Sequence, residues 1–312
     1  MNIQKWLNEN CSSLKNKTIV ITGTTGGIGS AALEILVSLE ANIIVGVRNV
    51  ERAKSMCEQF ILNGAKIEIE KLDLTDITSI KDFAKKVTYL APDGIDALIN
   101  NAGVLAKTKE ILPCGYEKHF FVNFLAPIML SKRLLPLLNK KENSKLVFLS
   151  SLSIFYTKIK FDDHNSTKIK GALKIYANSK KWLTYYVRHW RPEIKETYPN
   201  VSVNLVSPGI SGTALLLPDK KHKIRYTLAK IPMSILFHKP KKACLNEIFA
   251  LYTNANDDEW IEPAGLLGAY GYPKVTKLKL KLENDDIEKQ VFEKTNKILS
   301  STSKMQIIAE YL

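Results

Sequence analysis

The sequence predicts an α/β fold of the Rossmann type, in which a doubly wound parallel sheet carries helices on both faces. Short β-branched runs alternate with helical patterns, and a glycine-rich turn joins the first run to the first long helix. The chain has 312 residues, enough for one large domain. Such alternation implies right-handed crossovers between parallel strands.

The predicted strands are six apolar runs, with a seventh expected near residues 266–270. The six runs cover residues 18–22, 42–47, 66–72, 97–100, 145–149 and 201–206. The helical patterns between them cover residues 28–39, 50–62, 77–87, 116–138 and 176–190. Pro127 lies inside the fourth of these helices and should kink or interrupt it, because proline has no amide hydrogen to donate.

Three segments lie outside this rhythm. The first dozen residues predict a short surface helix around Trp6. Residues 211–242 mix apolar and basic side chains after a strand end, where a lid over a bound ligand would lie. Residues 1–275 would form the nucleotide-binding domain and 276–312 a helical extension. That extension has an amphipathic pattern at Ile287, Val291, Phe292 and Ile298.

The composition excludes several classes of protein. The formal net charge of +14 fits either a lysine-rich surface or attraction to anions such as a phosphorylated cofactor. The sequence has no basic block interleaved with aromatic residues, so we do not expect it to bind nucleic acid. The four cysteines form no C-x-x-C pair, so we expect free thiols and no metal. With no signal peptide and no apolar run near 18 residues, a cytoplasmic location is expected.

The glycine-rich turn predicts a pyrophosphate site. Its glycines leave room for the close approach of a phosphate to the backbone, and the following helix presents free N–H groups. The residues expected to bind there are Gly23, Thr25, Gly27, Ile28 and Gly29.

The end of the second strand indicates which dinucleotide binds. Enzymes that use NAD commonly place a carboxylate there to bind the ribose hydroxyls. Arg48 occupies the place instead, and its guanidinium would attract a ribose 2′-phosphate, with Arg52 one helical turn later. The cofactor is therefore expected to be NADP(H).

By its motifs, the chain resembles the short-chain dehydrogenase/reductase family. The motifs lie in family order and in fitting strand or helix contexts over about residues 15–215. They are Thr22-Gly23-x-x-x-Gly27-Ile28-Gly29, Asn100-Asn101-Ala102-Gly103, Ser150-Ser151, Tyr176-x-x-x-Lys180 and Ser207-Pro208-Gly209.

The resemblance implies a catalytic set of Ser151, Tyr176, Lys180 and Asn123. Tyr176 would be the general acid/base, and a nearby ammonium would lower its pKa from about 10. Lys180 lies four residues later on the same helix face and would also bind the nicotinamide ribose. Ser151 would hydrogen-bond the reacting oxygen, with Ser150 or Ser153 as open alternatives, and Asn123 would hold a water in a proton relay.

The resemblance also implies further cofactor contacts. Asp73 and Leu74 would lie beside the adenine, and Asn101, Ala102 and Gly103 along the adenosine ribose. Near the nicotinamide carboxamide we expect Pro208, Gly209 and Thr213.

The interval of 25 residues from Ser151 to Tyr176 resembles that of the retinol dehydrogenase-like and hydroxysteroid dehydrogenase-like branch. Its extra residues, 158–174, should form a loop at the rim of the site. The apolar side chains of 211–242 suggest a bulky steroid-, retinoid- or lipid-like alcohol or carbonyl substrate, unless they pack on the domain or on a second subunit.

Other interpretations stay open at this stage. The apolar and basic residues of 211–242 are compatible with membrane contact, although we do not expect it. Family members are commonly homodimers or homotetramers. The chain could also be a nucleotide-sensing interaction protein that has lost turnover, or a reductase of carbon–carbon double bonds.

Overall fold

The computed structural model describes residues 2–159, 161–210, 239–280 and 286–310, with backbone only for 302–310. Its centre is an eight-stranded sheet in the order β3-β2-β1-β4-β5-β6-β7-β8. The first seven strands pair in parallel, and β8 pairs antiparallel with β7. The predicted doubly wound sheet is therefore confirmed.

The strands follow the predicted runs closely except at the last edge. They are β1 (Thr18–Thr22), β2 (Asn42–Val47), β3 (Ile67–Lys71), β4 (Ala97–Asn100), β5 (Ser144–Leu149), β6 (Val201–Val206), β7 (Glu259–Pro263) and β8 (Pro273–Lys277). The strand expected near 266–270 is wrong. Residues 266–268 form a short 3-10 turn, η3, because two successive residues there, Leu267 and Gly268, have positive φ.

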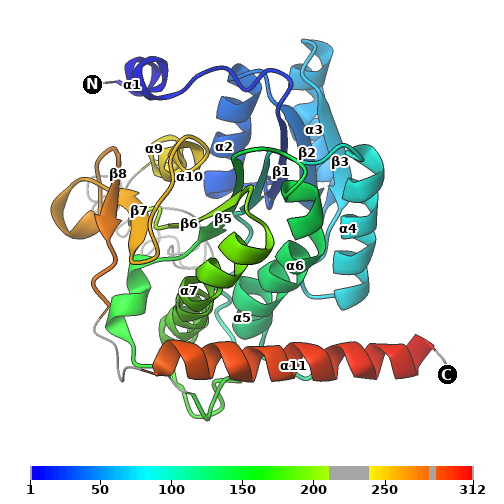
Figure 1. Cartoon of the computed structure of the whole chain (residues 1–312), viewed down its shortest axis with the longest axis vertical. Coiled ribbons are helices and arrows are strands. Elements are labelled where there is room, and N and C mark those ends of the chain that lie inside the picture. Colours follow the sequence, from blue (N-terminus) through cyan, green and yellow to red (C-terminus); the bar gives the residue numbers. More distant parts are fainter. Residues whose placement is uncertain (1, 160, 211–238, 281–285, 311–312) are drawn as a thin grey trace, which may run out of the picture.

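The helices cover both faces of the sheet. Before β5 they are α1 (Ile3–Asn10), α2 (Gly27–Ser38), α3 (Val50–Leu62), α4 (Ile77–Leu90), α5 (Lys118–Phe120) and α6 (Ala126–Leu138). After it they are α7 (Ala172–Thr197), α9 (Pro240–Ala243), α10 (Leu245–Phe249) and α11 (Ile287–Glu310). A 3-10 helix, η2 (Leu152–Tyr156), follows β5. Figure 1 shows α11, in red, running across the lower part of the molecule next to α7.

Successive strand residues point to opposite faces and so build two apolar cores. Val20 belongs to a core with α4, α6, α7 and α11, whereas its neighbours Ile19 and Ile21 belong to the core beneath α2, α3 and α10. The N-terminal helix is not the surface element that was expected. Trp6 is buried and stacks on Tyr272, so α1 covers the edge of the second core.

Pro127 interrupts the long helix in a specific way. The turn before it, η1 (Phe121–Leu125), is a π-helix, and the amide of Ala126 donates to the carbonyl of Phe121 five residues earlier. Proline has no amide hydrogen, so it cannot give Asn123 the donor that its carbonyl would have in an α-helix. The stretch Lys118–Leu138 is long and apolar enough to cross a membrane, but 83% of its apolar window is buried inside the protein.

The C-terminal region extends this fold. The boundary expected at residue 275 falls inside β8, and α11 packs along α7. Tyr186 of α7 stacks on Phe292, with ring centroids 5.0 Å apart, and its hydroxyl donates to Asn296. Ile287 and Val291 are buried, in line with the amphipathic pattern. The proposed lid, apart from its last residues, lies outside the described part of the chain, as does Thr213.

Candidate active site

The carboxyl ends of β1, β4, β5 and β6 bring the separate motifs together. In parallel sheets with helices on both faces, ligands bind at this edge. A cavity of about 280 Å³ opens there, and residues of the glycine turn, of the end of β2 and of the motif after β4 line it. Its lining includes Gly23, Thr25, Arg48, Arg52, Asp73, Leu74, Ala102 and Gly103.

The glycine turn packs too closely for side chains. A Cβ at Gly29 would lie 2.4 Å from both Asn101 Nδ2 and the Gly23 carbonyl oxygen. Gly23 has φ of +75°, and a Cβ there would lie 2.8 Å from Ala102. Asn101 fastens the turn by donating to the carbonyls of Thr22 and Gly23, at 2.7 and 3.1 Å. These contacts hold the end of β1 against the motif after β4. The glycines leave the backbone of the turn without side chains.

The ribose end of the cavity is rich in cations. Arg48 and Arg52 line it, and the Lys71 ammonium donates to the carbonyl of Arg48 at 2.7 Å. Burial alone would raise the pKa of Asp73, but hydrogen bonds from Thr75 and the charges of Arg48 and Lys71 hold it below its usual value. Asp73 thus stays ionised and turned toward Thr75, which leaves the guanidinium groups beside the open space.

Tyr176, Lys180 and Ser151 meet beside this cavity. The two α7 residues share a helix face, and the Ser151 hydroxyl, at the end of β5, lies close enough to the Tyr176 phenol to lower its pKa. The Lys180 ammonium donates to the Leu149 carbonyl at 2.6 Å. A Cβ at Gly103 would lie 3.7 Å from Lys180 Nζ, so the lysine borders the fourth-strand motif.

The pKa shifts in this group arise mainly from burial. Burial raises the pKa of Tyr176, and the nearby Ser151 hydroxyl opposes the shift. Burial lowers the pKa of Lys180 to about 8. The expected lowering of the tyrosine pKa by the lysine is therefore not what the protein alone shows, because desolvation is the larger effect at both groups.

The serine alternatives are narrowed by their partners. Ser150 is buried, and its hydroxyl is hydrogen-bonded to Thr184 at 2.7 Å. Ser153 has a buried hydroxyl with no hydrogen-bond partner among the described residues. Of the three serines, only Ser151 acts on the pKa of Tyr176, which favours Ser151, with Ser153 two residues away.

Asn123 lies in the π-helical turn. Its side-chain oxygen accepts from the Val104 amide at 2.7 Å, and its Nδ2 donates to the Val104 carbonyl and to Ser179. The side chain therefore fixes the segment after β4. The relay expected of this residue stays a prediction, and the atom available for it is the backbone carbonyl, which Pro127 deprives of an α-helical donor.

The segment after β6 is pinned near the same edge. Gly209 has φ of +75°, and a Cβ there would lie 2.6 Å from the Ala269 carbonyl oxygen. Pro208 precedes it, so both residues lie where a nicotinamide contact is expected. In the loop of residues 158–174, irregular structure extends to Gly171 before α7 begins, apart from residue 160, which is outside the described part.

A buried network beside the site was not found from the sequence. Glu117 and His119 are both fully buried, and Glu117 Oε1 lies 2.7 Å from His119 Nδ1. The other ring nitrogen, Nε2, accepts from the Ala106 amide at 2.9 Å. These bonds attach the 101–106 segment to α5. Only the E-x-H spacing could have indicated them.

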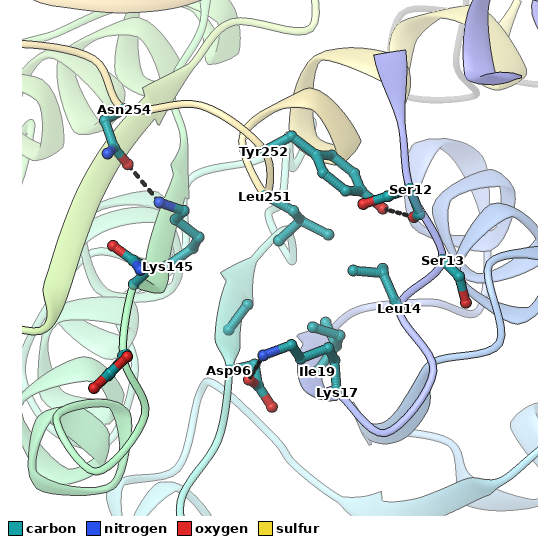
Figure 2. Close-up of a pocket in the computed structure, with 13 residues that line it drawn as sticks. Ser12, Ser13, Leu14, Lys17, Ile19, Asp96, Lys145, Leu251, Tyr252 and Asn254 are labelled. Atoms are coloured by element: carbon teal, nitrogen blue, oxygen red, sulfur yellow. Dashed lines mark hydrogen bonds and ion pairs between the residues drawn. The ribbon is translucent and has the colours of Figure 1, made fainter. Parts of the chain in front are cut away.

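A second and larger cavity, of about 440 Å³, lies at the opposite, amino end of the strands. Figure 2 shows its polar side chains around Leu14, Ile19 and Leu251. Lys17 is paired with Asp96 at 3.0 Å, and Lys145 donates to Asn254. None of the catalytic or nucleotide motifs reaches it. Among the described residues, no group of three His, Cys, Asp or Glu could hold a metal ion.

Comparison with known proteins agrees with this geometry. Residues 17–223 match the short chain dehydrogenase family model. Mouse retinol dehydrogenase 14 is 32% identical over 218 residues, covering 65% of this chain and 63% of that protein. Human polyprenol dehydrogenase is 28% identical over 290 residues, covering 90% of this chain and 84% of that protein.

Solved structures show the same fold. An uncharacterised protein from Mycobacterium paratuberculosis aligns with a TM-score of 0.73 at 21% identity, over 92% of this chain and 95% of that one. A structure described as an NAD(P)-dependent gluconate 5-dehydrogenase from Beutenbergia cavernae, with bound NADP, aligns with a TM-score of 0.61 at 22% identity, over 78% and 92%. The chain is a member of the short-chain dehydrogenase/reductase family, and it spans just under two thirds of the length of the retinol dehydrogenase it matches.

Proposed function

We propose that the protein is an NADP(H)-dependent oxidoreductase that interconverts an apolar, lipid-like alcohol and its aldehyde or ketone. The observation that carries this proposal is the placement of the Ser151 hydroxyl next to the Tyr176 phenol and near the buried Lys180, beside the cavity of about 280 Å³ that the glycine turn lines. An interaction protein that only senses a nucleotide has no need of these three residues.

The residues present fit an NADP(H) dinucleotide. Gly23 and Gly29 keep the turn free of side chains for a pyrophosphate, and Arg48 with Arg52 would hold a 2′-phosphate. Asn101 to Gly103 would lie along a ribose. When bound, the nicotinamide supplies or accepts the hydride.

The chain's own residues would handle the proton and the substrate oxygen. In reduction, Tyr176 gives its phenolic proton to the carbonyl oxygen, which Ser151 holds by a hydrogen bond. In oxidation the phenolate accepts the alcohol proton. Lys180 supplies a positive charge beside the phenol and can donate to a ribose hydroxyl, and the Asn123 carbonyl would hold a water that exchanges protons with the lysine.

The substrate class is supported by the relatives. Retinol and polyprenol, the alcohols in the names of two of them, are both apolar isoprenoids. The match to retinol dehydrogenase 14 covers under two thirds of that protein, so the substrate remains part of the proposal. A cytoplasmic location and a homo-oligomeric state likewise remain proposals.

The test measures NADPH and NADH oxidation with isoprenoid aldehydes, steroid ketones and small soluble carbonyls, with the products identified. We expect turnover with NADPH on apolar carbonyls, an alcohol product, and at least a 100-fold loss in Tyr176→Phe, about the lower limit for a general acid. A saturated product that retains its carbonyl would instead support carbon–carbon double-bond reduction. Nucleotide binding with no turnover on any compound would support the sensor.

A further inference from the structure

Exposed apolar side chains gather beside the catalytic edge of the sheet. They belong to η2, directly after Ser151, and to the loop between β7 and β8. We call this set the apolar rim, and its members with their exposed fractions are Phe155 (47%), Tyr156 (80%), Leu266 (70%), Leu267 (84%) and Tyr270 (51%). Large apolar side chains this exposed, and gathered in one place, are typical of an interaction surface.

The two segments of the rim lie against each other. A Cβ at Gly268 would lie 3.4 Å from Leu152 Cδ2, and the Phe155 ring meets Trp260 edge-on at 5.8 Å. The amide of Ile210, after β6, donates to the Ala269 carbonyl at 3.0 Å. The rim therefore borders the proposed nicotinamide segment on one side and Ser151 on the other.

The loop holds its leucines outward in a fixed and unfavourable conformation. Leu267 has φ of 52° and ψ of 28°, a region that brings a leucine Cβ close to the following carbonyl. Backbone bonds close the loop, including Gly265 to the Tyr270 carbonyl at 2.6 Å. Strained residues persist where the surrounding structure imposes them, and they cluster at functional sites. Figure 1 shows this loop in orange beside β7 and β8, at the left edge of the molecule.

Exposed lysines close in sequence to the rim favour an anionic lipid surface as its occupant. Lys158 follows Tyr156 by two residues, Lys174 precedes Tyr176 on α7, and Lys274 follows Tyr270 by four, and all three are exposed. The chain as a whole carries a net charge of +14. Projecting apolar side chains flanked by lysines bind bilayers by inserting below the headgroups while the ammonium groups meet anionic lipids.

We propose that the apolar rim docks the protein on an anionic lipid bilayer, with the mouth of the catalytic site facing the membrane. This surface is made only of described residues. Docking itself does not require the proposed function. Entry of an apolar alcohol from the bilayer into the site does rest on the proposed function.

The experiment is sedimentation of the full chain with large unilamellar vesicles of phosphatidylcholine containing phosphatidylserine, without nucleotide or substrate. We expect binding that weakens with salt and with removal of phosphatidylserine. The pair Leu266→Ser with Leu267→Ser should lower the partition constant at least about tenfold, because two leucines no longer insert. The matched control pair, Ile61→Ser with Leu62→Ser, alters two exposed apolar residues at the end of α3, across the sheet, and should leave binding unchanged.

One further variant separates docking from a structural role. Leu267→Gly relieves the positive φ, since glycine adopts that region freely, and removes the apolar group. Docking predicts a higher or equal melting temperature together with weaker vesicle binding. A leucine that merely stabilises the loop predicts that the melting temperature falls and vesicle binding does not change.

Three results overturn the proposal: no binding to anionic vesicles, equal loss in the control pair, or unchanged binding in both rim variants. Light scattering tests the rival occupant, a second copy of the chain. If the rim joins two copies, the protein is a dimer, the Leu266→Ser with Leu267→Ser pair dissociates it, and no vesicle binding is seen. If vesicles bind through the rim but no apolar alcohol is turned over, the proposed function fails and docking stands. If turnover occurs without vesicle binding, docking alone fails.

Discussion

Two cavities lie at opposite ends of the same parallel strands, and they differ in how their charges are satisfied. At the amino end, about 440 Å³ is lined by Lys17 paired with Asp96 and by Lys145 bonded to Asn254. At the carboxyl end, about 280 Å³ is lined by Arg48 and Arg52, while Asp73 is bonded within its own turn. In the smaller cavity the two guanidinium groups are placed to bind a ligand. The hydrogen-bonding state of the charged groups therefore identifies the site better than the cavity volume does.

The largest expected difference between the two ends comes from Lys180. Lys180→Met should lower turnover about 100-fold or more, since it removes the charge beside the general acid. Its stability effect follows the pKa, which burial lowers from 10.5 to about 8. Between these values the unfolded chain binds the additional proton, so the lysine makes wild-type stability rise with pH across that window.

Measured by denaturation from pH 7 to 10.5, this rise should be absent in Lys180→Met. A shift from 10.5 to about 8 corresponds to about 3 kcal/mol. Equal pH dependence in both proteins would contradict the buried, desolvated lysine. Circular dichroism at pH 7 provides the control for folding.

The next effect concerns the close packing of the glycine turn. Gly29→Ala should cost about 1–3 kcal/mol of stability and weaken NADPH binding, because its Cβ would overlap Asn101 Nδ2. Gly26→Ala is the matched control, since its Cβ would find only the Arg52 guanidinium, at 4.0 Å. Thermal denaturation of both variants, with NADPH fluorescence titration of Gly29→Ala, makes the measurement. Similar melting temperatures for the two variants would refute the packing account.

A smaller effect is expected at the ribose end. Arg48→Ala should reduce the affinity for NADPH about 10- to 100-fold, the range of a charge-assisted hydrogen bond, with little change for NADH. Arg52→Ala should act in the same direction but less. Dissociation constants for both nucleotides test this, and an unchanged NADPH-to-NADH ratio in Arg48→Ala would rule out the role of the guanidinium.

The smallest effect is expected at the amino-end cavity. Lys145→Met removes a buried ammonium whose pKa burial lowers, and its exposed partner Asn254 can be rehydrated. Stability should change by less than about 1 kcal/mol and kcat/KM by less than about twofold. Steady-state kinetics and thermal denaturation measure both. A large loss of activity would show that the two ends are coupled and would undo the contrast.

The sequence was sufficient for β1 to β6 because each of these strands is a short run rich in apolar residues and separated from the next by a helical pattern. It failed at the last edge. Leu266 to Tyr270 has the composition of a strand, yet glycines at 265, 268 and 271 turn the chain, while the real strand, Glu259–Pro263, carries two glutamates. Trp6 was placed at the surface because its partner Tyr272 is 266 residues away.

The residues of the site could be predicted from their motifs, but the direction of their pKa shifts could not. The order of the motifs implied that Ser151, Tyr176 and Lys180 meet, and these residues do lie together. The direction of the tyrosine pKa was not accessible, because burial depends on the whole fold. The apolar rim was missed for a similar reason. Its leucines look like core residues until the positive φ of Leu267 turns them outward.

The packing of α11 on α7 has a consequence for biosynthesis. The helix that carries Tyr176 and Lys180 receives part of its covering from residues made about a hundred positions later, such as Asn296 against Tyr186. A nascent chain that already contains every motif still exposes one face of the catalytic helix on the ribosome. We therefore expect maturation of the site to wait for α11, and nascent chains that end before or after α11, each followed by a linker that spans the ribosomal exit tunnel, should show protease resistance of α7 only when α11 is present.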